Sequence, residues 1–265
     1  MKIGVCGICG RMGVSVLQVL MERGHDLSAA FDHEKANGFG SDAGTLVHGN
    51  PMNVTIAAIN AKDVGASAGI IDFSSPAASM RLLETVREVK KPLVIGTTGF
   101  TAEEKSGIEK AARDIPILFS PNMSLGVNLL FKLTEVASRA LTTEYDVEIF
   151  EAHHRLKKDA PSGTAKRLLE IIRNSMPGLK DAKEVSGREG ITGERTKHEI
   201  GVLAMRGGDI VGEHTVYFTG IGERIELTHR ATSREILSKG AVTAMEYLSD
   251  KPAGLYTMFD VLGLK

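Results

Sequence analysis

The chain has 265 residues with nearly balanced charge, 32 basic against 33 acidic side chains. This length allows one large or two modest domains, and the balance argues against an extended nucleic-acid surface or a basic membrane patch. No apolar run reaches the roughly 18 residues of a membrane span, and cysteines in adjacent turns do not form a secretory disulfide framework. We therefore expect a cytoplasmic protein that binds neither nucleic acid nor a membrane.

The chain opens with a predicted strand, a glycine turn and a predicted helix. Residues 2–6 are a short apolar run, Gly7-Ile-Cys-Gly-Arg-Met-Gly13 follows, and residues 14–23 carry an apolar helical stripe closed by Gly24. Glycines let the backbone turn tightly and approach a pyrophosphate, and a helix N-terminus supplies N–H donors to it. The segment predicts a dinucleotide-binding loop, although its G-x-x-G-x-x-G spacing differs from the usual G-x-G-x-x-G and is only moderately specific.

The same turn contains a C-x-x-C pair, Cys6 and Cys9, which in other proteins can be a thiol redox pair. We favour the nucleotide-loop interpretation, because glycines bracket these residues and Cys6 is expected to face into the sheet. For Cys9, a position at a helix N-terminus predicts a lowered thiol pKa and susceptibility to oxidation. We expect such oxidation to crowd the pyrophosphate site.

A second predicted strand, residues 26–31, ends at Asp32, which is followed by His33. An acidic side chain at this point can accept hydrogen bonds from an adenosine ribose and favours NAD, whereas Arg11 and His33 can lie near the 2′-phosphate of NADP. We expect both NADH and NADPH to serve as cofactor. The alternative is that Asp32 only ends a strand.

Apolar runs and helix candidates alternate along the next part of the chain. Runs at 69–73, 93–96 and 115–119 are separated by helix candidates at 77–88 and 102–113. Such alternation predicts a parallel doubly wound sheet with helices on both faces. In these sheets ligands bind beyond the carboxyl ends of the strands, so the segments that follow the strands are expected near the glycine turn.

Three such segments carry small polar side chains. They are Ser74-Ser75, Gly96-Thr-Thr-Gly99 and Ser120-Pro-Asn-Met123. Turn chemistry alone can explain each of them. Thr97, Thr98 and Asn122 nevertheless supply the hydroxyl and amide groups expected near a nicotinamide carboxamide.

The pattern changes after a predicted helix at 125–139. The polar, glycine-bearing segment 174–196 predicts a mobile loop, and a helix-like run at 233–249 is expected to return to the first domain with the tail that follows. Four runs predict the strands of a second sheet: 145–153, 197–205, 210–219 and 223–230. The expected fold class is α/β, a Rossmann-like doubly wound parallel sheet of residues 1–123 completed by 235–265, with a second α+β domain at 124–234 that carries a mostly open mixed sheet.

The most informative segment is Glu151-Ala-His-His-Arg-Leu-Lys-Lys-Asp-Ala-Pro-Ser-Gly-Thr164. His153 and His154 stand where a strand ends, so their rings are expected to point different ways. Histidine suits general acid catalysis near neutral pH, and neighbouring lysines attract anions. Ser162 opens a predicted helix whose free N–H groups can hold a carboxylate. Taken singly, each imidazole or lysine has a purely structural alternative, and it is their clustering that predicts a catalytic loop for an acidic substrate.

Five motifs together resemble the 4-hydroxy-tetrahydrodipicolinate reductase family, also called dihydrodipicolinate reductases, of bacterial lysine biosynthesis. The resemblance covers almost the whole chain, and its most specific part is the block from His153 to Thr164. The motifs are Gly7-x-x-Gly10-Arg-Met-Gly13, Gly40-Ser-Asp-Ala-Gly44, Gly96-Thr-Thr-Gly99, Asn122-Met-Ser-x-Gly-Val-Asn128 and Glu151-Ala-His-His-x-x-Lys-x-Asp-Ala-Pro-Ser-Gly-Thr164.

The resemblance implies NAD(P)H-dependent reduction of 4-hydroxy-tetrahydrodipicolinate to tetrahydrodipicolinate with loss of water, by a homotetramer joined through sheets of the second domain. It places the proton donor at His153 and the catalytic lysine at Lys157. The dicarboxylate substrate is expected to contact His154, Ser162, Gly163, Thr164 and Arg234. The cofactor is expected to contact Gly7, Ile8, Cys9, Gly10, Arg11, Met12, Asp32, His33, Gly96, Thr97, Thr98, Ser120, Pro121, Asn122 and Met123.

Some relatives carry arginine at the position of His33, so the choice between NADH and NADPH stays open. The scheme requires no metal, and the remaining histidines show no ligand spacing: His25, His48, His198, His214 and His229. Two rival functions are another Rossmann dehydrogenase acting on an amino-acid semialdehyde or imino acid, and a non-enzymatic nicotinamide sensor. The first does not need the block from His153 to Thr164, and the second needs a partner-binding or DNA-binding element that the sequence does not display.

Overall fold

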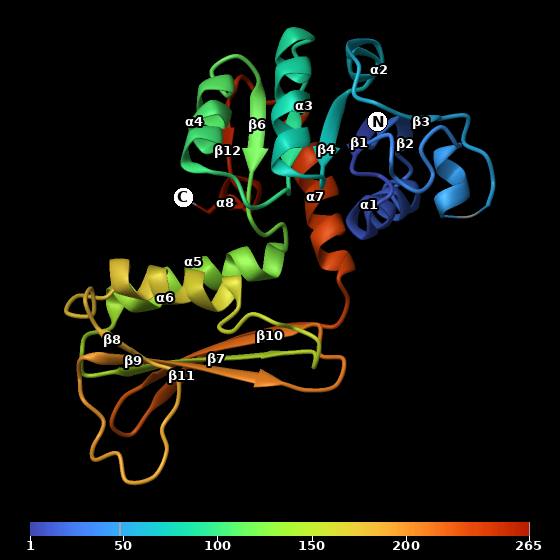
Figure 1. Cartoon of the computed structure of the whole chain (residues 1–265). Helices are drawn as coiled ribbons and strands as arrows, with labels where there is room; N and C mark the ends of the chain where they lie inside the picture. The colour runs from blue at the N-terminus through green and yellow to red at the C-terminus, as the bar shows by residue number, and fades with distance from the viewer. Residues whose placement is uncertain (48, 265) are drawn as a thin grey trace. The chain divides into compact units, whose positions relative to one another are not determined.

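The computed structural model describes residues 1–47 and 49–264, so His48 lies outside the described residues. The described chain forms two compact units (Figure 1). Unit 1 comprises Met1–Leu125 and Glu235–Lys265, and unit 2 comprises Gly126–Arg234. Among the described residues, no helix has both the length and the apolar composition needed to cross a membrane.

Unit 1 is built on a seven-stranded sheet in which every strand pairing is parallel, and the predicted doubly wound sheet is thereby confirmed. The strand order is β12-β6-β5-β4-β1-β2-β3. The strands are β1 Lys2–Cys6, β2 Asp26–Phe31, β3 Ile56–Ala57, β4 Gly69–Asp72, β5 Leu93–Ile95, β6 Pro116–Phe119 and β12 Gly254–Tyr256.

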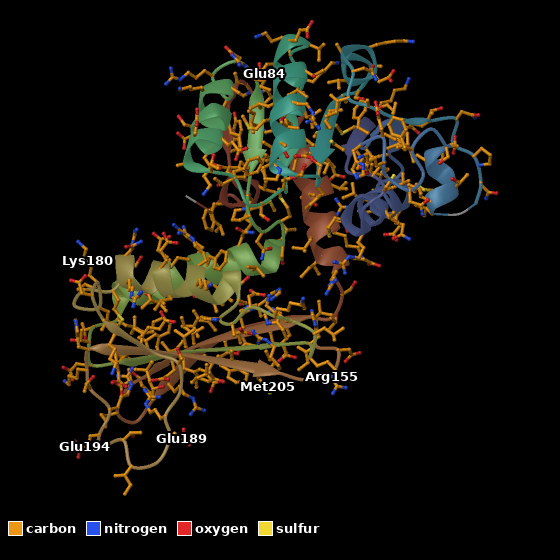
Figure 2. All side chains as sticks on the ribbon, viewed as in Figure 1. Glu84, Arg155, Lys180, Glu189, Glu194 and Met205 are labelled. Atoms are coloured by element: carbon orange, nitrogen blue, oxygen red, sulfur yellow. The ribbon has the colours of Figure 1, made fainter. Side chains whose placement is uncertain are left out.

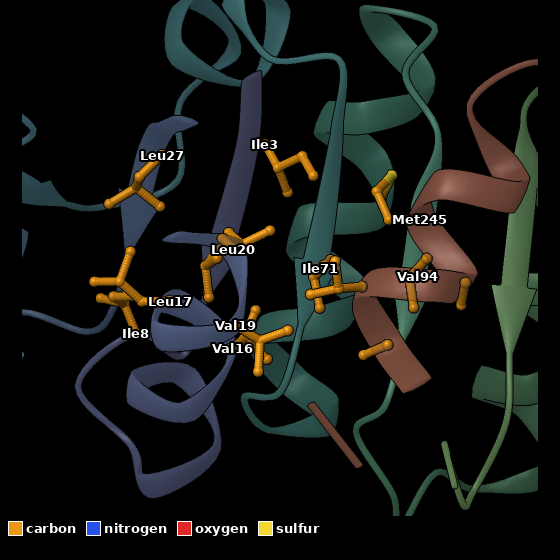
Figure 3. Close-up of a cluster of buried hydrophobic side chains, with 14 of the residues drawn as sticks. Ile3, Ile8, Val16, Leu17, Val19, Leu20, Leu27, Ile71, Val94 and Met245 are labelled. Carbon is orange, nitrogen blue, oxygen red and sulfur yellow. The ribbon is translucent and has the colours of Figure 1, made fainter. Parts of the chain in front are cut away.

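Helices cover both faces of this sheet, since neighbouring residues of one strand enter different hydrophobic clusters. Ile71 joins the cluster of α1 (Arg11–Glu22) and α7 (Glu235–Leu248), whereas Ile70 joins that of the helices on the other face. Figure 3 shows the first cluster, with Val16, Leu17 and Met245 among its members. The other helices of the unit are α2 Ala61–Ala66, α3 Pro76–Glu88, α4 Ala102–Ala111 and α8 Met258–Val261, with a 3-10 turn at Ala43–Leu46.

Unit 2 contains a five-stranded mixed sheet of order β11-β10-β7-β9-β8, as expected for the second domain. Strand β10 runs antiparallel to both β11 and β7, whereas β9 runs parallel to β7 and β8. Both helices of the unit lie on the same side of the sheet (Figure 1). The elements are α5 Leu125–Ala140, β7 Asp146–His153, α6 Gly163–Ser175, β8 Lys183–Val185, β9 Glu199–Arg206, β10 Gly212–Thr219 and β11 Arg224–Ala231.

The segment 174–196, for which we predicted a mobile loop, is more structured than expected. It includes β8, which pairs with β9, and two arginines that bind carboxylates of the sheet. Arg188 lies 2.9 Å from Glu148 and 2.7 Å from Glu199, and Arg195 lies 3.1 Å from Glu148. These partners lie elsewhere in the chain, so the local polarity of the segment did not reveal them. Glu189 and Glu194, labelled in Figure 2, project from the loop between β8 and β9.

Candidate functional site

The glycine turn after β1 is folded so tightly that side chains cannot replace Gly7 or Gly13. Gly7 has a φ of 80°, and a Cβ there would lie 2.2 Å from the carbonyl oxygen of Phe73. A Cβ on Gly13 would lie 2.2 Å from the carbonyl oxygen of Gly7. Because α1 begins at Arg11, directly after the turn, the turn opens a helix N-terminus as a pyrophosphate loop requires.

Asp32 links the end of β2 to this turn. Its Oδ2 accepts a hydrogen bond of 2.9 Å from the backbone N–H of Cys9, and its Oδ1 accepts one of 2.8 Å from the N–H of His33. The His33 ring is exposed, with Nε2 3.9 Å from the same carboxylate. The alternative that Asp32 only ends a strand therefore understates its role, because it also holds the glycine turn in place.

A cavity of about 1150 Å³ lies beside the turn. Of the predicted cofactor residues, five line it: Gly7, Cys9, Gly10, Asp32 and His33. Two further cations in its wall, Lys35 and Arg81, were not anticipated from the sequence. Arg81 lies on α3, almost fifty residues from Asp32, and only the fold brings it to this cavity. The cavity is large enough for an extended nucleotide ligand.

The other predicted cofactor residues do not line the cavity. Ile8 and Met123 are buried in the hydrophobic core, whereas Arg11, Thr98 and Pro121 are exposed and Met12 and Gly96 are half-buried. Ser120 and Asn122 hydrogen-bond within their own loop, where the Ser120 hydroxyl donates to the Asn122 carbonyl at 2.7 Å. Thr97 contacts a buried carboxylate whose role was not predicted from the sequence.

That carboxylate is Asp72, the last residue of β4, which is fully buried. It accepts hydrogen bonds from the hydroxyls of Ser74 at 2.5 Å and Thr97 at 3.0 Å, and from that of Ser79. Thr97 in turn accepts the N–H of Ser74 at 2.9 Å. Burial raises the pKa of Asp72, and the hydroxyl hydrogen bonds offset this only in part. The carboxyl group thus joins the segments that follow β4 and β5.

The prediction for Cys9 was wrong in direction. Burial and the charge of Asp32 raise the pKa of the Cys9 thiol to about 11. Burial also raises the pKa of the Cys6 thiol, with the charge of Asp72 acting in the same sense. Both cysteines are free, so the structure contains no Cys6–Cys9 disulfide. The position of Cys9 at a helix N-terminus did not predict its pKa, because the carboxylate of Asp32 interacts with the sulfur and raises the pKa.

In unit 2, one face of the sheet changes from apolar to polar along β7. Because side chains alternate along a strand, Val147, Ile149, Glu151 and His153 share a face, and the first three are fully buried. Across the sheet, His153 pairs with Arg206 of β9. The polar end lies near Arg155 and Met205, which Figure 2 labels.

Glu151 is fully buried and receives four hydrogen bonds. The Nη1 and Nη2 atoms of Arg206 donate to Oε2 and Oε1, both at 2.8 Å. His153 Nδ1 lies 2.6 Å from Oε2, and the backbone N–H of Ser162 lies 3.0 Å from Oε1. Burial by itself would raise the pKa of Glu151, but the hydrogen bonds from Arg206, His153 and Ser162 outweigh it and hold the pKa below its usual value.

The contact with Glu151 fixes the proton on His153. A carboxylate only accepts hydrogen bonds, so Nδ1 must carry a hydrogen and Nε2 is left for another partner. A Cβ on Gly212 would lie 3.1 Å from Nε2, so the glycine keeps that edge of the ring clear. Burial lowers the pKa of His153, and the hydrogen bond and charge of Glu151 counteract this in part.

Ser162 is the N-cap of α6, and its polar atoms are engaged within the unit. Its hydroxyl oxygen accepts the N–H of Ala165 at 3.2 Å and lies 2.9 Å from Nε2 of His214. Burial lowers the pKa of His214 to about 3, so that ring is neutral. Gly163 is exposed, and a Cβ there would meet no atom within 4 Å. Gly163 and Thr164 therefore present the open part of this helix start.

The remaining predicted site residues have partners nearby. Lys157 Nζ lies 2.8 Å from Asp159, and the Lys157 N–H donates to the His154 carbonyl at 3.1 Å. Arg234 Nη2 lies 3.2 Å from Nε2 of His154. The two adjacent imidazoles thus have different partners, as their position at a strand end predicted. Among the described residues, no group of three or more histidine, cysteine or acidic side chains is placed to hold a metal ion.

A glycine turn at the start of a helix, with an aspartate at the end of the second strand and a cavity beside both, is the arrangement of a dinucleotide-dependent oxidoreductase. Two family models match the chain. They describe the N-terminus and the C-terminus of dihydrodipicolinate reductase and match residues 1–123 and 126–262. The chain belongs to the dihydrodipicolinate reductase family.

Curated relatives agree with this assignment. A 4-hydroxy-tetrahydrodipicolinate reductase of Trichlorobacter lovleyi is 46% identical over 100% of this chain and 99% of the relative. One of Nitrosomonas eutropha is 47% identical, again over 100% of this chain and 99% of the relative. Among solved structures, a dipicolinate-bound dihydrodipicolinate reductase of Paenisporosarcina superposes with a TM-score of 0.78 over 98% of each chain, at 23% identity, and supports the fold.

Proposed function

We propose that the chain catalyses NAD(P)H-dependent reduction of 4-hydroxy-tetrahydrodipicolinate to tetrahydrodipicolinate, with loss of water, in the diaminopimelate route to lysine. The observation that carries this proposal is the match of both family models over nearly the whole chain. Curated relatives of the same name cover all of it. The rival dehydrogenase and sensor functions have no comparable support.

His153 is proposed to be the proton donor. Water first leaves the substrate, so that its hydroxyl-bearing carbon becomes part of a carbon–carbon double bond conjugated to the ring imine. Bound NAD(P)H would supply a hydride to that carbon, and the adjacent carbon, which gains the displaced electrons, would take a proton. The Nε2 edge of His153 is clear, whereas Nδ1 is committed to Glu151, so Nε2 is the atom that can deliver it. The donor leaves this step as a neutral ring that keeps its Nδ1 hydrogen.

The dicarboxylate substrate is proposed to bind at the same end of unit 2. Lys157 supplies a positive charge near one carboxylate and lowers the barrier electrostatically, and the open N–H groups of Gly163 and Thr164 hold the other. His154 and Arg234 are proposed to contact the substrate as a hydrogen-bonded pair. Ser162 contributes mainly by fixing the helix start, because its own N–H and hydroxyl already have partners.

The cofactor is proposed to bind at the glycine turn of unit 1. Its pyrophosphate would lie on the N–H groups of Gly7 to Met12, its ribose against Asp32 and His33, and its nicotinamide toward Gly96, Thr97, Thr98 and the segment Ser120 to Met123. The cavity beside Asp32 supports the adenosine end of this placement. Thr97 and Ser120 would act partly by shaping their loops, since their hydroxyls have internal partners.

We propose that both NADH and NADPH are used. Asp32 can accept hydrogen bonds from a ribose with free hydroxyls, which favours NADH. His33, Lys35 and Arg81 add cationic or protonatable groups to the same cavity and can accommodate a 2′-phosphate. The steady-state ratio of the two rates is the direct measure of this balance.

We further propose a cytoplasmic homotetramer assembled through the sheets of unit 2. One face of the sheet lies opposite Glu151 and carries Phe150, Leu203, Met205 and Tyr217. The helices of unit 2 lie on the other face, the one that carries Glu151. Met205, which lies on the face opposite Glu151 near the end of β9, is 43% exposed, which is high for a large apolar side chain. Sedimentation of the purified protein would measure the assembly state.

The decisive test is oxidation of NADPH and NADH by the purified protein, coupled to a synthase that forms the unstable substrate from pyruvate and aspartate semialdehyde. Loss of the dihydronicotinamide absorbance that depends on both precursors supports the proposal. Cofactor binding without turnover would favour the sensor, and turnover on other semialdehydes or imino acids but not on this substrate would favour the rival dehydrogenase.

A further inference from the structure

Arg206 and the candidate proton donor His153 are neighbours across β7 and β9, and the side chains of both bind Glu151. Both Arg206 and His153 lie 2.6–2.8 Å from the same oxygen, Oε2 of Glu151, so one carboxylate oxygen is shared between a guanidinium and an imidazole. The second nitrogen of Arg206 binds Oε1 at 2.8 Å and makes the pair bidentate. The Arg206 side chain is 21% exposed and that of Glu151 is not exposed at all, so solvent screens this contact weakly.

The charged and titratable groups around His153 come from every element packed against it. Glu151 precedes it on β7, Arg206 lies on β9, His214 on β10 and Lys157 on the loop that follows. The His214 ring stands 5.2 Å from the His153 ring at 75° and is neutral, as described above. Asp159 is a second carboxylate nearby, but it pairs with Lys157 at 2.8 Å, whereas Glu151 is in direct contact with His153. The charge of Glu151 is therefore what holds a proton on His153.

A carboxylate in contact with an imidazole raises the pKa of the ring when no cation neutralises the carboxylate, so the ring retains its second proton more strongly. A general acid has to release that proton near the working pH. A buried Glu151 without a cation would therefore position His153 correctly but make it a weaker acid. Arg206 removes part of this effect, because its guanidinium competes for the same carboxylate oxygen and neutralises the charge.

We propose that Arg206 is a positioning residue that acts through Glu151 to set how readily His153 releases the proton on Nε2. Glu151 keeps the Nδ1–H form of the ring in place, and Arg206 limits how strongly the carboxylate retains the second proton. During the reaction the Nε2 proton passes to the substrate carbon, while Glu151 stays ionised and Arg206 stays charged. The inference rests on the proposed function for the role of His153 and adds the two residues that tune it.

The test compares the wild type with Glu151→Gln, Arg206→Gln and the double variant. Histidine-selective nitrogen NMR, with His153 assigned by its loss in His153→Gln, gives the tautomer and the pKa of His153 in each protein. We expect the Nδ1–H tautomer in the wild type. Glu151→Gln should lower the pKa of His153 by about one pH unit, and Arg206→Gln should raise it by a similar amount.

The double variant separates a relay through Glu151 from direct repulsion between Arg206 and His153. If Arg206 acts through the carboxylate, adding Arg206→Gln to the Glu151→Gln protein should raise the pKa of His153 much less than adding it to the wild type. Equal shifts in the two proteins would overturn the proposal, and so would shifts of the same sign in the two single variants. General disruption of the sheet would not produce opposite signs.

Two further variants guard against misfolding and non-specific effects. Arg206→Lys keeps the charge but loses the bidentate contact, and it should leave the pKa of His153 near its wild-type value; a rise as large as that expected for Arg206→Gln would contradict a role of charge. If Arg206→Gln does not fold, Glu151→Gln and Arg206→Lys still decide the question. Arg188→Gln is the matched control, because Arg188 binds Glu148 and Glu199 of the same sheet and should leave His153 unchanged.

The pH dependence of kcat/KM provides the catalytic readout. Activity falls as pH rises through the pKa of the acid, so this alkaline limit should move to lower pH in Glu151→Gln and to higher pH in Arg206→Gln. If the wild type turns over the substrate but the alkaline limit of kcat/KM does not move in the variants, this inference is overturned and the proposed function stands. A wild type without turnover would overturn the proposed function, and the NMR titration would still decide how Arg206 and Glu151 act on His153.

Discussion

Asp72 of unit 1 and Glu151 of unit 2 are both fully buried carboxyl groups near the ends of strands, yet their pKa values move in opposite directions. Asp72 is surrounded by hydroxyl groups, and burial prevails and raises its pKa. Glu151 is bound by a guanidinium, an imidazole and a backbone N–H, and these outweigh burial. The charge of the partner, more than the degree of burial, decides in which direction the pKa of a buried carboxyl group moves.

The difference matches what each group does. Hydroxyl donors let Asp72 tie together the segments after β4 and β5. Charged donors keep Glu151 ionised beside an imidazole that is proposed to transfer a proton. One carboxyl group therefore stabilises loops, and the other is proposed to support proton transfer by His153.

The largest expected effect is the loss of stability when Glu151 loses its cation. Arg206→Met leaves a buried carboxylate without its main partner and should cost about 3 kcal/mol or more of the free energy of unfolding of unit 2. Asp72→Asn exchanges one polar group for another and should cost about 1 to 3 kcal/mol. Urea unfolding, monitored by hydrogen exchange of the amides in each unit, measures the unfolding free energy of both variants. Arg188→Met, which removes a more exposed ion pair, is the control, and equal losses in Arg206→Met and Arg188→Met would contradict the comparison.

The next effect is on catalysis and should be confined to unit 2. His153→Gln and Lys157→Ala should each lower kcat by about 100-fold or more, because they remove the proposed proton donor and the positive charge proposed to act on the substrate. The affinity for NADH should be unchanged, as measured by fluorescence titration. Lys158→Ala is the matched control, since Lys158 is the exposed neighbour of Lys157. Loss of NADH binding in either variant would show that the roles of the two units are wrongly assigned.

A third effect is the pH dependence of stability, which should have opposite signs for the two carboxyl groups. The folded-state pKa of Asp72 is raised, so its contribution to stability is present at low pH and is lost as pH rises through that pKa. The pKa of Glu151 is lowered, so its contribution is present above the ordinary value and is lost as pH falls. As pH rises, the unfolding free energy of the wild type should fall relative to that of Asp72→Asn and rise relative to that of Glu151→Gln. Each difference should change by at most about 1.4 kcal/mol per pH unit. Parallel slopes would rule out this interpretation.

The smallest expected effect concerns Cys9. With a pKa of about 11 its thiol should be alkylated by iodoacetamide at pH 8 far more slowly than an ordinary thiol, roughly 100-fold, because so little thiolate is present. Mass spectrometry of the labelled protein gives the rate, and Cys9→Ser shows any contribution from the buried Cys6. Substituting Asp32 by Asn should speed the labelling. Rapid labelling of the wild type would instead support the lowered pKa predicted from the sequence.

The sequence allowed the local parts of the fold to be predicted well. The bounds of β1 and β2 were predicted as observed, and the alternation of strands and helices correctly indicated the parallel sheet. The glycine turn could be recognised because its chemistry is carried by the backbone over seven consecutive residues. Short elements such as β3, α2 and β8 were missed, since two to six residues carry too little periodicity.

The parts of the site that were missed depend on pairings between distant segments. Arg206 reaches Glu151 only because β9 lies beside β7 in one particular register, and nothing near Arg206 in the sequence indicates it. Asp72 looked like an ordinary strand end, because its hydroxyl partners come from α3 and from the segment after β5. The error for Cys9 had the same origin, since the influence of Asp32 on the thiol comes from the next strand.

Unit 1 is built from two separate stretches of chain, and this affects the order in which the two units fold during synthesis. Residues Ala241, Val242 and Met245 of α7 fill one face of its sheet, and β12 pairs with β6. That face of the nucleotide-binding sheet therefore stays only partly covered, by α1, until the segment beyond residue 234 has left the ribosome, whereas unit 2 is one continuous stretch that can fold before it. A nascent chain stalled with β11 outside the ribosome and α7 still inside it should already protect the amides of β7 while those of β1 still exchange.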